Sequence, residues 1–239
     1  METEVKPRLR LGSYNVRAGL GTDMRRDAAR AIRTIAGLGA DILALQEADF
    51  RLGQRPAALP PARLTDETGL HIVPAGRHAT SLGWHGIALL HRPSIEVSDI
   101  HRLDLPGLEP RGALITDFET ELGPLRVVAV HLGLLRRSRK SQLAYIDSHL
   151  HDLAPRPTVM IGDFNEWSRK KGFDTLSDRF NVLRPGATFP SRRPVLGLDR
   201  VVHCEGLLAN VQVARPEKGP HPSDHLPILA EIELGAAAP

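Results

Sequence analysis

Side chains that can bind metal ions or transfer protons stand where the apolar segments of this sequence end. Asn15 ends one apolar run, Gln46 and Glu47 end the next, and His131 ends a third. Later runs are bordered by the rest of the set, Asp163, Asn165, Asp199, Asp224 and His225. Functional groups often converge in loops at the edge of a rigid sheet. The set therefore predicts one site assembled from distant parts of the chain.

Oxygen-bearing side chains dominate the set, which has three aspartates, one glutamate and two asparagines beside two histidines. Carboxylate and amide oxygens suit Mg²⁺ or Mn²⁺, whereas a structural zinc site requires cysteine or more histidine. A single Asp or Asn after a strand is most often a turn residue or a helix cap. The prediction of a Mg²⁺ or Mn²⁺ cofactor therefore depends on the complete set.

The apolar runs that position these side chains have the length of β-strands. We expect strands over residues 9–15, 41–46, 86–91, 113–118, 125–130, 158–161, 198–202 and 226–234. In the last of these, Ile228, Ala230 and Ile232 alternate with Glu231 and Glu233. A period of two residues indicates a half-buried strand.

Helical periodicity is clearest in two segments. Residues 24–38 follow a candidate N-cap, Asp23, and residues 137–153 repeat leucine and isoleucine on one side. Shorter helices are expected over residues 61–68 and 167–176. Strands outnumber helices, and several strands follow one another directly, which favours two packed sheets with outer helices over a βαβ sheet. We expect one domain over residues 1–239, with its core at about 9–234.

The composition of the 239 residues excludes several classes of protein. A content of 41% hydrophobic and 25% charged residues is ordinary for a globular protein and excludes extensive disorder. No apolar stretch reaches the roughly 18 residues of a membrane span, and residues 1–10 lack the apolar core of a secretory signal. Cys204 is the single cysteine, which fits a reducing compartment. We expect a cytoplasmic location and no obligate protein partner.

Six short motifs follow one another along most of the chain. They are Asn15-Val16, Gln46-Glu47, His131-Leu132, Gly162-Asp163-Phe164-Asn165, Leu198-Asp199-Arg200 and Ser223-Asp224-His225. In this order they resemble the endonuclease/exonuclease/phosphatase superfamily of DNase I-like proteins. The segment Thr188-Phe189-Pro190-Ser191, which leads into Leu198-Asp199-Arg200, is similar to its compact bacterial members in particular. The resemblance implies a four-layer α/β sandwich, with two packed mixed β-sheets flanked by helices, and a metal-dependent phosphoric ester hydrolase.

The resemblance also implies which residues meet the metal ion and the substrate phosphate. Glu47 is the main metal ligand that it implies, with Asn15 and Asp224 beside it. Arg111 matches an arginine near the site of family members and is expected to contact the substrate phosphate, unless it is a solvated loop residue.

Five further residues receive catalytic roles from the resemblance. Asp163 is expected to act on the attacking water as a base or as an orienting group, and Asn165 to hold that water or a phosphate oxygen. His131 is expected to contact the phosphate. Asp199 and His225 are expected to form a hydrogen-bonded pair, in which the carboxylate favours the charged imidazole.

The substrate class stays open at the level of sequence. We expect a Mg²⁺-dependent phosphodiesterase that uses water, with a lipid headgroup, a nucleotide or a nucleic acid as the substrate. A repair-type DNA endonuclease or exonuclease is the alternative, although Arg17 stands where abasic-site endonucleases tend to carry Asp. His85 lies where some nucleases carry a carboxylate that pairs with a histidine like His131. A binding module without catalysis would have lost one of the named residues, and none is missing.

Two features have both a structural and a functional interpretation. The basic cluster Arg136-Arg137-Ser138-Arg139-Lys140 is either a solvated helix start or an edge that binds a phosphate or a headgroup. Cations in the first turn oppose the helix dipole, which slightly favours the functional interpretation. Trp84 and Trp167 either stack on a substrate or pack in the core.

Overall fold

The computed structural model describes residues 8–168, 171–215 and 220–234, and these form two six-stranded β-sheets. The first sheet has the order β11 (Leu207–Val213), β12 (Ile228–Leu234), β1 (Leu9–Asn15), β2 (Ile42–Gln46), β4 (Ala88–His91), β3 (His71–Ile72). The second has the order β5 (Glu96–Leu105), β6 (Arg111–Thr120), β7 (Gly123–His131), β8 (Thr158–Asp163), β10 (Asp199–Cys204), β9 (Phe180–Leu183). The eight predicted strands are all present, with ends shifted by a few residues.

Each sheet is built around one parallel pair of strands with antiparallel strands on both sides. β1 pairs with β2, after the crossover through α1 (Ala28–Leu38), and β7 pairs with β8, after the crossover through α3 (Arg136–Asp152). The last residues of each pair are in register, Asn15 with Gln46 and His131 with Asp163. Parallel pairing therefore brings the ends of four strands, with their polar residues, to one edge of the molecule.

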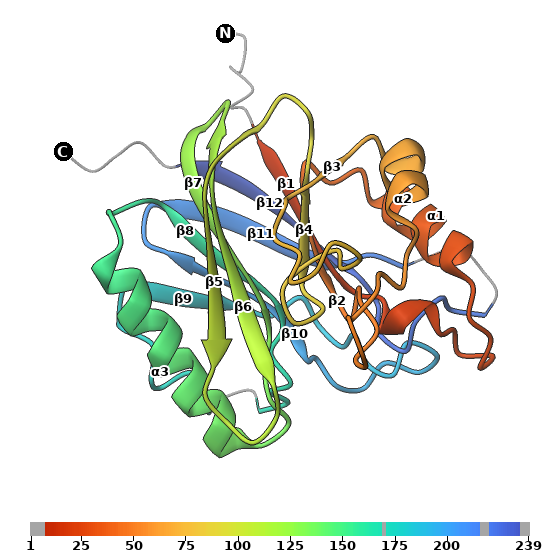
Figure 1. Cartoon of the computed structure of the whole chain (residues 1–239). Helices are drawn as coiled ribbons and strands as arrows, with labels where there is room; N and C mark the ends of the chain where they lie inside the picture. Colours follow the sequence, from red (N-terminus) through yellow and green to blue (C-terminus); the bar gives the residue numbers. More distant parts are fainter. Residues whose placement is uncertain (1–7, 169–170, 216–219, 235–239) are drawn as a thin grey trace, which may run out of the picture.

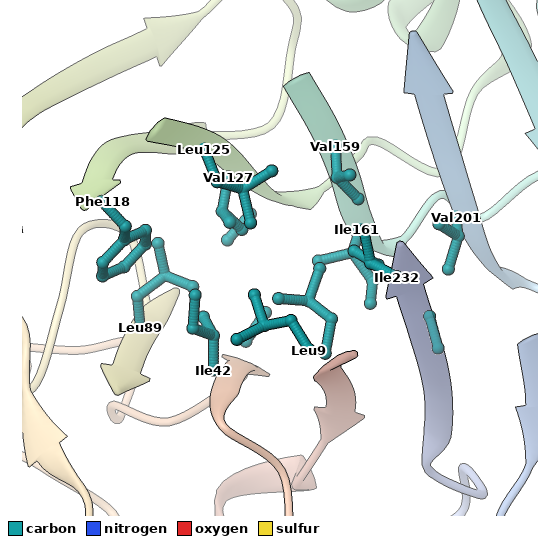
Figure 2. Packing of buried hydrophobic residues seen from close by; sticks show 14 of the residues in the cluster. Leu9, Ile42, Leu89, Phe118, Leu125, Val127, Val159, Ile161, Val201 and Ile232 are labelled. Carbon is teal, nitrogen blue, oxygen red and sulfur yellow. The ribbon is translucent and has the colours of Figure 1, made fainter. Parts of the chain in front are cut away.

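Buried aliphatic side chains fill the space between the sheets, as Figure 2 shows for Leu9, Ile42, Val127 and Ile161. A second cluster lies under α1 and α2 (Pro61–Thr68), on the outer face of the first sheet. A third lies between α3 and the outer face of the second sheet. The helices therefore lie on opposite sides of the two sheets, and the expected four-layer α/β sandwich is confirmed (Figure 1).

The first helix begins later than the sequence predicted. Its N-cap is Asp27, whose carboxylate accepts the backbone N–H of Arg30 at 3.0 Å, and not Asp23. Asp23 instead pairs with the guanidinium of Arg30 at 2.9 Å. Met24 has a φ of +61°, which a right-handed helix does not allow. Residues 23–27 therefore form a loop, and a short 3-10 turn, η1 (Arg17–Gly19), precedes it.

The helix predicted over residues 167–176 is wrong for the residues that the structure describes there, since 169 and 170 lie outside the description. These residues form bends and turns, and Gly172 has a φ of +106° that breaks helical geometry. The polar edge strand β5 was not predicted, because its sequence EVSDIHRLDL has no apolar run. The strands β3, β9 and β11 were missed as well. No helix in the described ranges is long and apolar enough to cross a membrane.

Candidate active site

A cavity of about 770 Å³ opens at the edge where β1, β2, β7 and β8 end. Eight of the nine predicted site residues line it: Asn15, Glu47, Arg111, His131, Asp163, Asn165, Asp224 and His225. The ninth, Asp199, is the first residue of β10 and contacts His225 from outside the cavity. The structure therefore brings together residues that lie more than 200 positions apart, such as Asn15 and Ser223, which are 208 residues apart.

Asp163, the last residue of β8, lies at the centre of the cluster. Asn15 donates its Nδ2–H to Asp163 Oδ2 at 3.1 Å, across from the other sheet. The Nε2 atoms of His131 and His225 lie 3.5 and 3.7 Å from the same oxygen. The other oxygen, Oδ1, accepts the backbone N–H of Asn165 at 2.9 Å. One carboxylate oxygen is thus fixed by the loop, while the other is shared among polar side chains.

His225 is held by a buried carboxylate. Its Nδ1 lies 3.0 Å from Asp199 Oδ2, and the hydroxyl of Thr188 donates to the same oxygen. Burial alone would lower the pKa of His225, but the carboxylates of Asp199 and Asp163 outweigh it and raise that pKa to about 10. His225 is therefore positively charged at neutral pH and presents two N–H donors.

His131 is neutral, in contrast to His225. Burial lowers the pKa of His131 to about 3 and outweighs the carboxylate of Asp163, which favours the protonated imidazole. Arg111 Nη1 lies 3.1 Å from His131 Nε2. Since a guanidinium only donates, Nε2 of His131 accepts this hydrogen bond. Arg111 is oriented in turn by Glu109, with two nitrogens 2.9 and 3.2 Å from Glu109 Oε2. A neutral and a charged imidazole therefore lie on either side of Asp163.

Glu47, Asn15 and Asp224 line the cavity with two carboxylates and one amide, and the amide oxygen of Asn15 accepts the backbone N–H of Arg17 at 3.0 Å. Glu47 has a φ of +52°, a left-handed conformation that costs a non-glycine residue free energy and is common at functional sites. Glu47 Oε1 pairs with Arg51 at 3.0 Å, and Asp224 Oδ2 with Arg17 at 3.2 Å. The second oxygen of each carboxylate has no ion-pair partner among the described residues. Two carboxylates and an amide, without sulfur, fit Mg²⁺ or Mn²⁺.

A second group with metal-like geometry consists of Asp163, Asp199 and His225, whose ligand atoms all lie within 4.8 Å of one another. Within this group, His225 Nδ1 lies 3.0 Å from Asp199 Oδ2, and His225 Nε2 lies 3.7 Å from Asp163 Oδ2. These three side chains are thus joined to one another by close polar contacts, and they lie beside Glu47, Asn15 and Asp224, to which the resemblance assigns the metal ion.

Three supporting residues had no predicted role. Thr188 orients Asp199, and Glu109 orients Arg111. Ser223 links two parts of the site, since its hydroxyl donates to the carbonyl of Asn15 and accepts the backbone N–H of His225. Ser223 and Thr188 belong to motifs that carry the family resemblance, whereas nothing in the sequence around Glu109 indicates which side chain it contacts.

The two departures from nuclease motifs have structural partners. Arg17 pairs with Asp224, so this position holds a cation where abasic-site endonucleases tend to carry a carboxylate. His85 Nε2 lies 2.6 Å from Asp104 Oδ1, and no hydrogen bond between His85 and His131 is found among the described residues. His131 therefore has an arginine, Arg111, as its side-chain partner in place of a dedicated carboxylate.

The basic cluster at the start of α3 divides into structural and exposed members. Arg139 is buried and pairs with Glu166 at 2.8 Å, and Arg136 pairs with the same carboxylate at 3.3 Å. Lys140 pairs with Asp174 on the surface. Arg136 and Arg139 line the cavity, whereas Arg137 and Lys140 do not, so only part of the cluster lies at the cavity.

Of the two tryptophans, one is structural and the other is exposed. Trp84 is half-buried and donates its Nε1–H to the carbonyl of Leu103 at 3.0 Å. Trp167 is 64% exposed and lines the cavity. Packing therefore accounts for Trp84, whereas Trp167 is free to contact a ligand.

The four-layer sandwich and the residues around its cavity define a DNase I-like α/β protein. The chain belongs to the Endonuclease/Exonuclease/phosphatase family, whose model matches residues 12–225. The resemblance inferred from the six motifs is thereby confirmed. Members of this superfamily are hydrolases that act on phosphoesters, including nucleic acids.

Relatives and structural neighbours agree with this assignment. The chain is 34% identical over 164 residues to the uncharacterized protein YbhP of Escherichia coli (strain K12), and the match covers 64% of each chain. A family protein from Bacteroides thetaiotaomicron superposes with a TM-score of 0.76, at 16% identity, over 95% of this chain and 98% of the other. A mannosyl-6-phosphatase of Bacteroides thetaiotaomicron VPI-5482 gives a TM-score of 0.73, at 17% identity, over 94% and 99%. At these identities the two structures show the fold alone.

Proposed function

We propose that the protein is a phosphodiesterase that depends on Mg²⁺ or Mn²⁺ and uses water as the nucleophile. The observation that carries this proposal is the surrounding of Asp163 Oδ2, which is shared by Asn15, the neutral His131 and the charged His225. A carboxylate oxygen that accepts a hydrogen bond from Asn15 and lies beside a charged imidazole, next to an oxygen ligand set, fits proton transfer at a phosphate.

The proposed reaction gives each residue a distinct task. Asp163 accepts a proton from the attacking water, which Asn165 positions. The oxygen of the water bonds to phosphorus, and the bond between phosphorus and the leaving oxygen breaks, so the leaving oxygen takes the electron pair. His225, oriented by Asp199, donates N–H to a phosphoryl oxygen. His131 and Arg111 bind the phosphate on the other side of Asp163.

Glu47, Asn15 and Asp224 would hold the divalent ion, which supplies stabilisation of negative charge on the phosphoryl oxygens. Arg17 and Arg51 line the same cavity and add positive charge around the bound phosphate. We also propose that residues 1–239 act as one domain in the cytoplasm.

A DNA endonuclease or exonuclease is the second candidate function. Arg17, Arg51 and Arg111 line the cavity and would contact phosphates of a nucleic acid strand. Against this candidate, Trp167 is the one tryptophan at the cavity, and nucleases commonly add further stacking side chains. A binding module without catalysis remains the third candidate, and the presence of every named catalytic residue opposes it.

A panel of substrates tests the proposal. It contains bis-p-nitrophenyl phosphate, p-nitrophenyl phosphate, plasmid DNA, a duplex with an abasic site, and phospholipids. We expect faster hydrolysis of the diester than of the monoester. Preferential cleavage of DNA would establish the second candidate, and preference for the monoester would make the protein a phosphatase, as the name of one structural neighbour would indicate.

Removal of the metal gives the sharpest control. Activity should vanish in EDTA and return with Mg²⁺ or Mn²⁺, because the ligands are oxygens. Glu47→Gln should require a higher metal concentration, with an unchanged thermal unfolding midpoint. Full activity after exhaustive chelation would contradict the proposal.

A further inference from the structure

Exposed apolar side chains gather along one rim of the cavity. Leu134, Leu135 and Trp167 line it and are 64%, 54% and 64% exposed. Trp167 also lines a neighbouring hollow together with Val195, which is 66% exposed. Leu108, at 88% exposed, stands next to Glu109, whose carboxylate accepts the backbone N–H of Leu134. We call Leu108, Leu134, Leu135, Trp167 and Val195 the apolar rim.

The concentration of these side chains at one place is unusual for a water-exposed surface. The other large, exposed hydrophobic residues of the described ranges are Met24, Leu52 and Tyr145. Single exposed hydrophobic residues need no explanation, but a contiguous group that borders a cavity marks an interaction surface. The five side chains come from four separate loops and are exposed, so they do not contribute to the packing of the core.

The start of α3 shows that the rim is not explained by helix stability. Leu135 is the N-cap of α3 and makes no side-chain capping bond, although Ser, Thr, Asp and Asn are the residues that stabilise this position. The first turn then carries Arg136 and Arg137 and no acidic residue, against the helix dipole. A leucine at the cap and Arg137 after it, which has no ion-pair partner among the described residues, are both unfavourable for the helix, so helix stability does not account for them.

Arginines flank the apolar rim at both ends. Arg136 and Arg137 follow Leu135, and Arg192 and Arg193 precede Val195; all four are exposed. Of these, only Arg136 has an ion-pair partner among the described residues. Apolar side chains beside unpaired cations are the combination that binds the surface of an anionic lipid bilayer, where the chains enter the interface and the cations meet lipid phosphates.

The β5–β6 connection, which carries Leu108, lies beside the start of α3 at one end of the molecule (Figure 1). The rim therefore faces outward at the mouth of the cavity that holds Asp163. A nucleic acid would also meet the arginines, but Trp167 is the one side chain of the rim on which a base could stack, and the four leucine and valine side chains give bases no stacking surface. The chemistry of the rim thus favours a lipid surface.

We infer that the apolar rim docks on an anionic phospholipid surface and presents lipid phosphodiesters to the cavity. The second part, that lipid phosphodiesters are the substrate, rests on the proposed function. Docking itself needs neither the metal ion nor turnover, so it can be measured separately.

The test is sedimentation with vesicles in EDTA. One set of vesicles contains phosphatidylcholine alone, and the other contains equal parts of phosphatidylcholine and phosphatidylglycerol. We expect the wild-type protein to bind the anionic vesicles. Leu108→Ser/Val195→Ser and Trp167→Ala should each bind about tenfold more weakly. Arg192→Gln should bind about fivefold more weakly at low salt.

Met24→Ser is the matched control, because Met24 is 68% exposed but precedes α1, away from the rim. It should bind like the wild type. Leu108 and Val195 do not line the cavity around Asp163, so their double variant should keep the wild-type rate on bis-p-nitrophenyl phosphate. If the wild type binds vesicles but hydrolyses no diester, the proposed function fails while the docking surface stands.

Three results would overturn the inference. They are wild-type protein that ignores both kinds of vesicle, rim variants that bind as tightly as Met24→Ser, and a dimer in solution that the rim variants dissociate. The last would show that the rim is covered by a second copy of the chain. Thermal unfolding of each variant shows whether it is folded, and Leu108→Ser/Val195→Ser, with both positions largely exposed, should be.

Discussion

Buried charge is handled in opposite ways at the two ends of the second sheet. Near one end, Asp117 is clamped by the guanidinium of Arg126 through two bonds of 2.7 and 2.8 Å, with Arg156 at 3.3 Å. At the other end, five residues further along β7 and β8 and so about 17 Å away by the rise of a β-strand, Asp163 Oδ2 accepts a hydrogen bond from Asn15 and lies 3.5 and 3.7 Å from two histidines. It has no arginine as an ion-pair partner among the described residues.

The difference separates a structural ion pair from a chemical site. Both Asp117 carboxylate oxygens meet guanidinium groups, so the charge is neutralised and no acceptor is left for a ligand. Asp163 is equally buried, but its neighbours include an amide and a neutral imidazole, and it lines a cavity. A buried carboxylate that is fully paired with guanidinium groups contributes to the stability of the fold, whereas a buried carboxylate without such a pair, at a cavity, can still contact a ligand.

The largest effect should come from Asp163→Asn. The amide keeps the shape but cannot accept a proton from water, so kcat/KM for a diester should fall by about 10²–10⁴-fold. The thermal unfolding midpoint, measured alongside, should change far less than in a variant of Asp117. Retention of activity would mean that Asp163 is not the base.

Asp117→Leu should show the reverse pattern. It leaves Arg126 buried without its partner, which costs about 3–5 kcal/mol in the free energy of unfolding. Activity per folded molecule should stay at the wild-type level. Asp117→Leu/Arg126→Leu should recover most of the stability, because removing both charges also removes their desolvation cost. Urea unfolding of the three proteins decides this, and a double variant no more stable than the single one would contradict it.

A double-mutant cycle on Asp199 and His225 tests whether these residues act as one unit. Asp199→Asn keeps the side-chain shape but removes the charge that favours the imidazolium. With His225→Ala in addition, kcat/KM should fall little further than in the worse single variant, which corresponds to a coupling energy of about 0.5–3 kcal/mol. Fully additive losses on one diester substrate would show that the two residues do not work together.

The smallest effect should come from an exposed pair near Asp117. Glu121 lies 3.3 Å from Arg92, with the two side chains 51% and 38% exposed. Glu121→Gln should cost at most about 1 kcal/mol in urea unfolding, since water and salt screen exposed charges. A cost close to that of Asp117→Leu would mean that burial does not set the strength of these pairs.

Much of this arrangement was predictable from the sequence because strands carry their own signal. Apolar runs located β1, β2, β7 and β8, and polar residues at their ends located the cavity. The rest depended on contacts between distant residues. Thr188 and Glu109 contact site residues that no local pattern identifies, and residues 167–176 have an apolar spacing that Gly172 and the loop around Glu166 override. The polar strand β5 exists because β6 pairs with it.

The position of β12 in the first sheet, next to β1, has a consequence for folding during synthesis. β1 is antiparallel to β12, and the hydroxyl of Ser223 bonds to Asn15, 208 residues away in the sequence. A ribosome releases β1 long before it releases β12, so a growing chain holds an incomplete first sheet and lacks Asp224 and His225. The hydrolase proposed here would therefore be inert throughout its synthesis, and its catalytic groups would assemble only in the last step of folding.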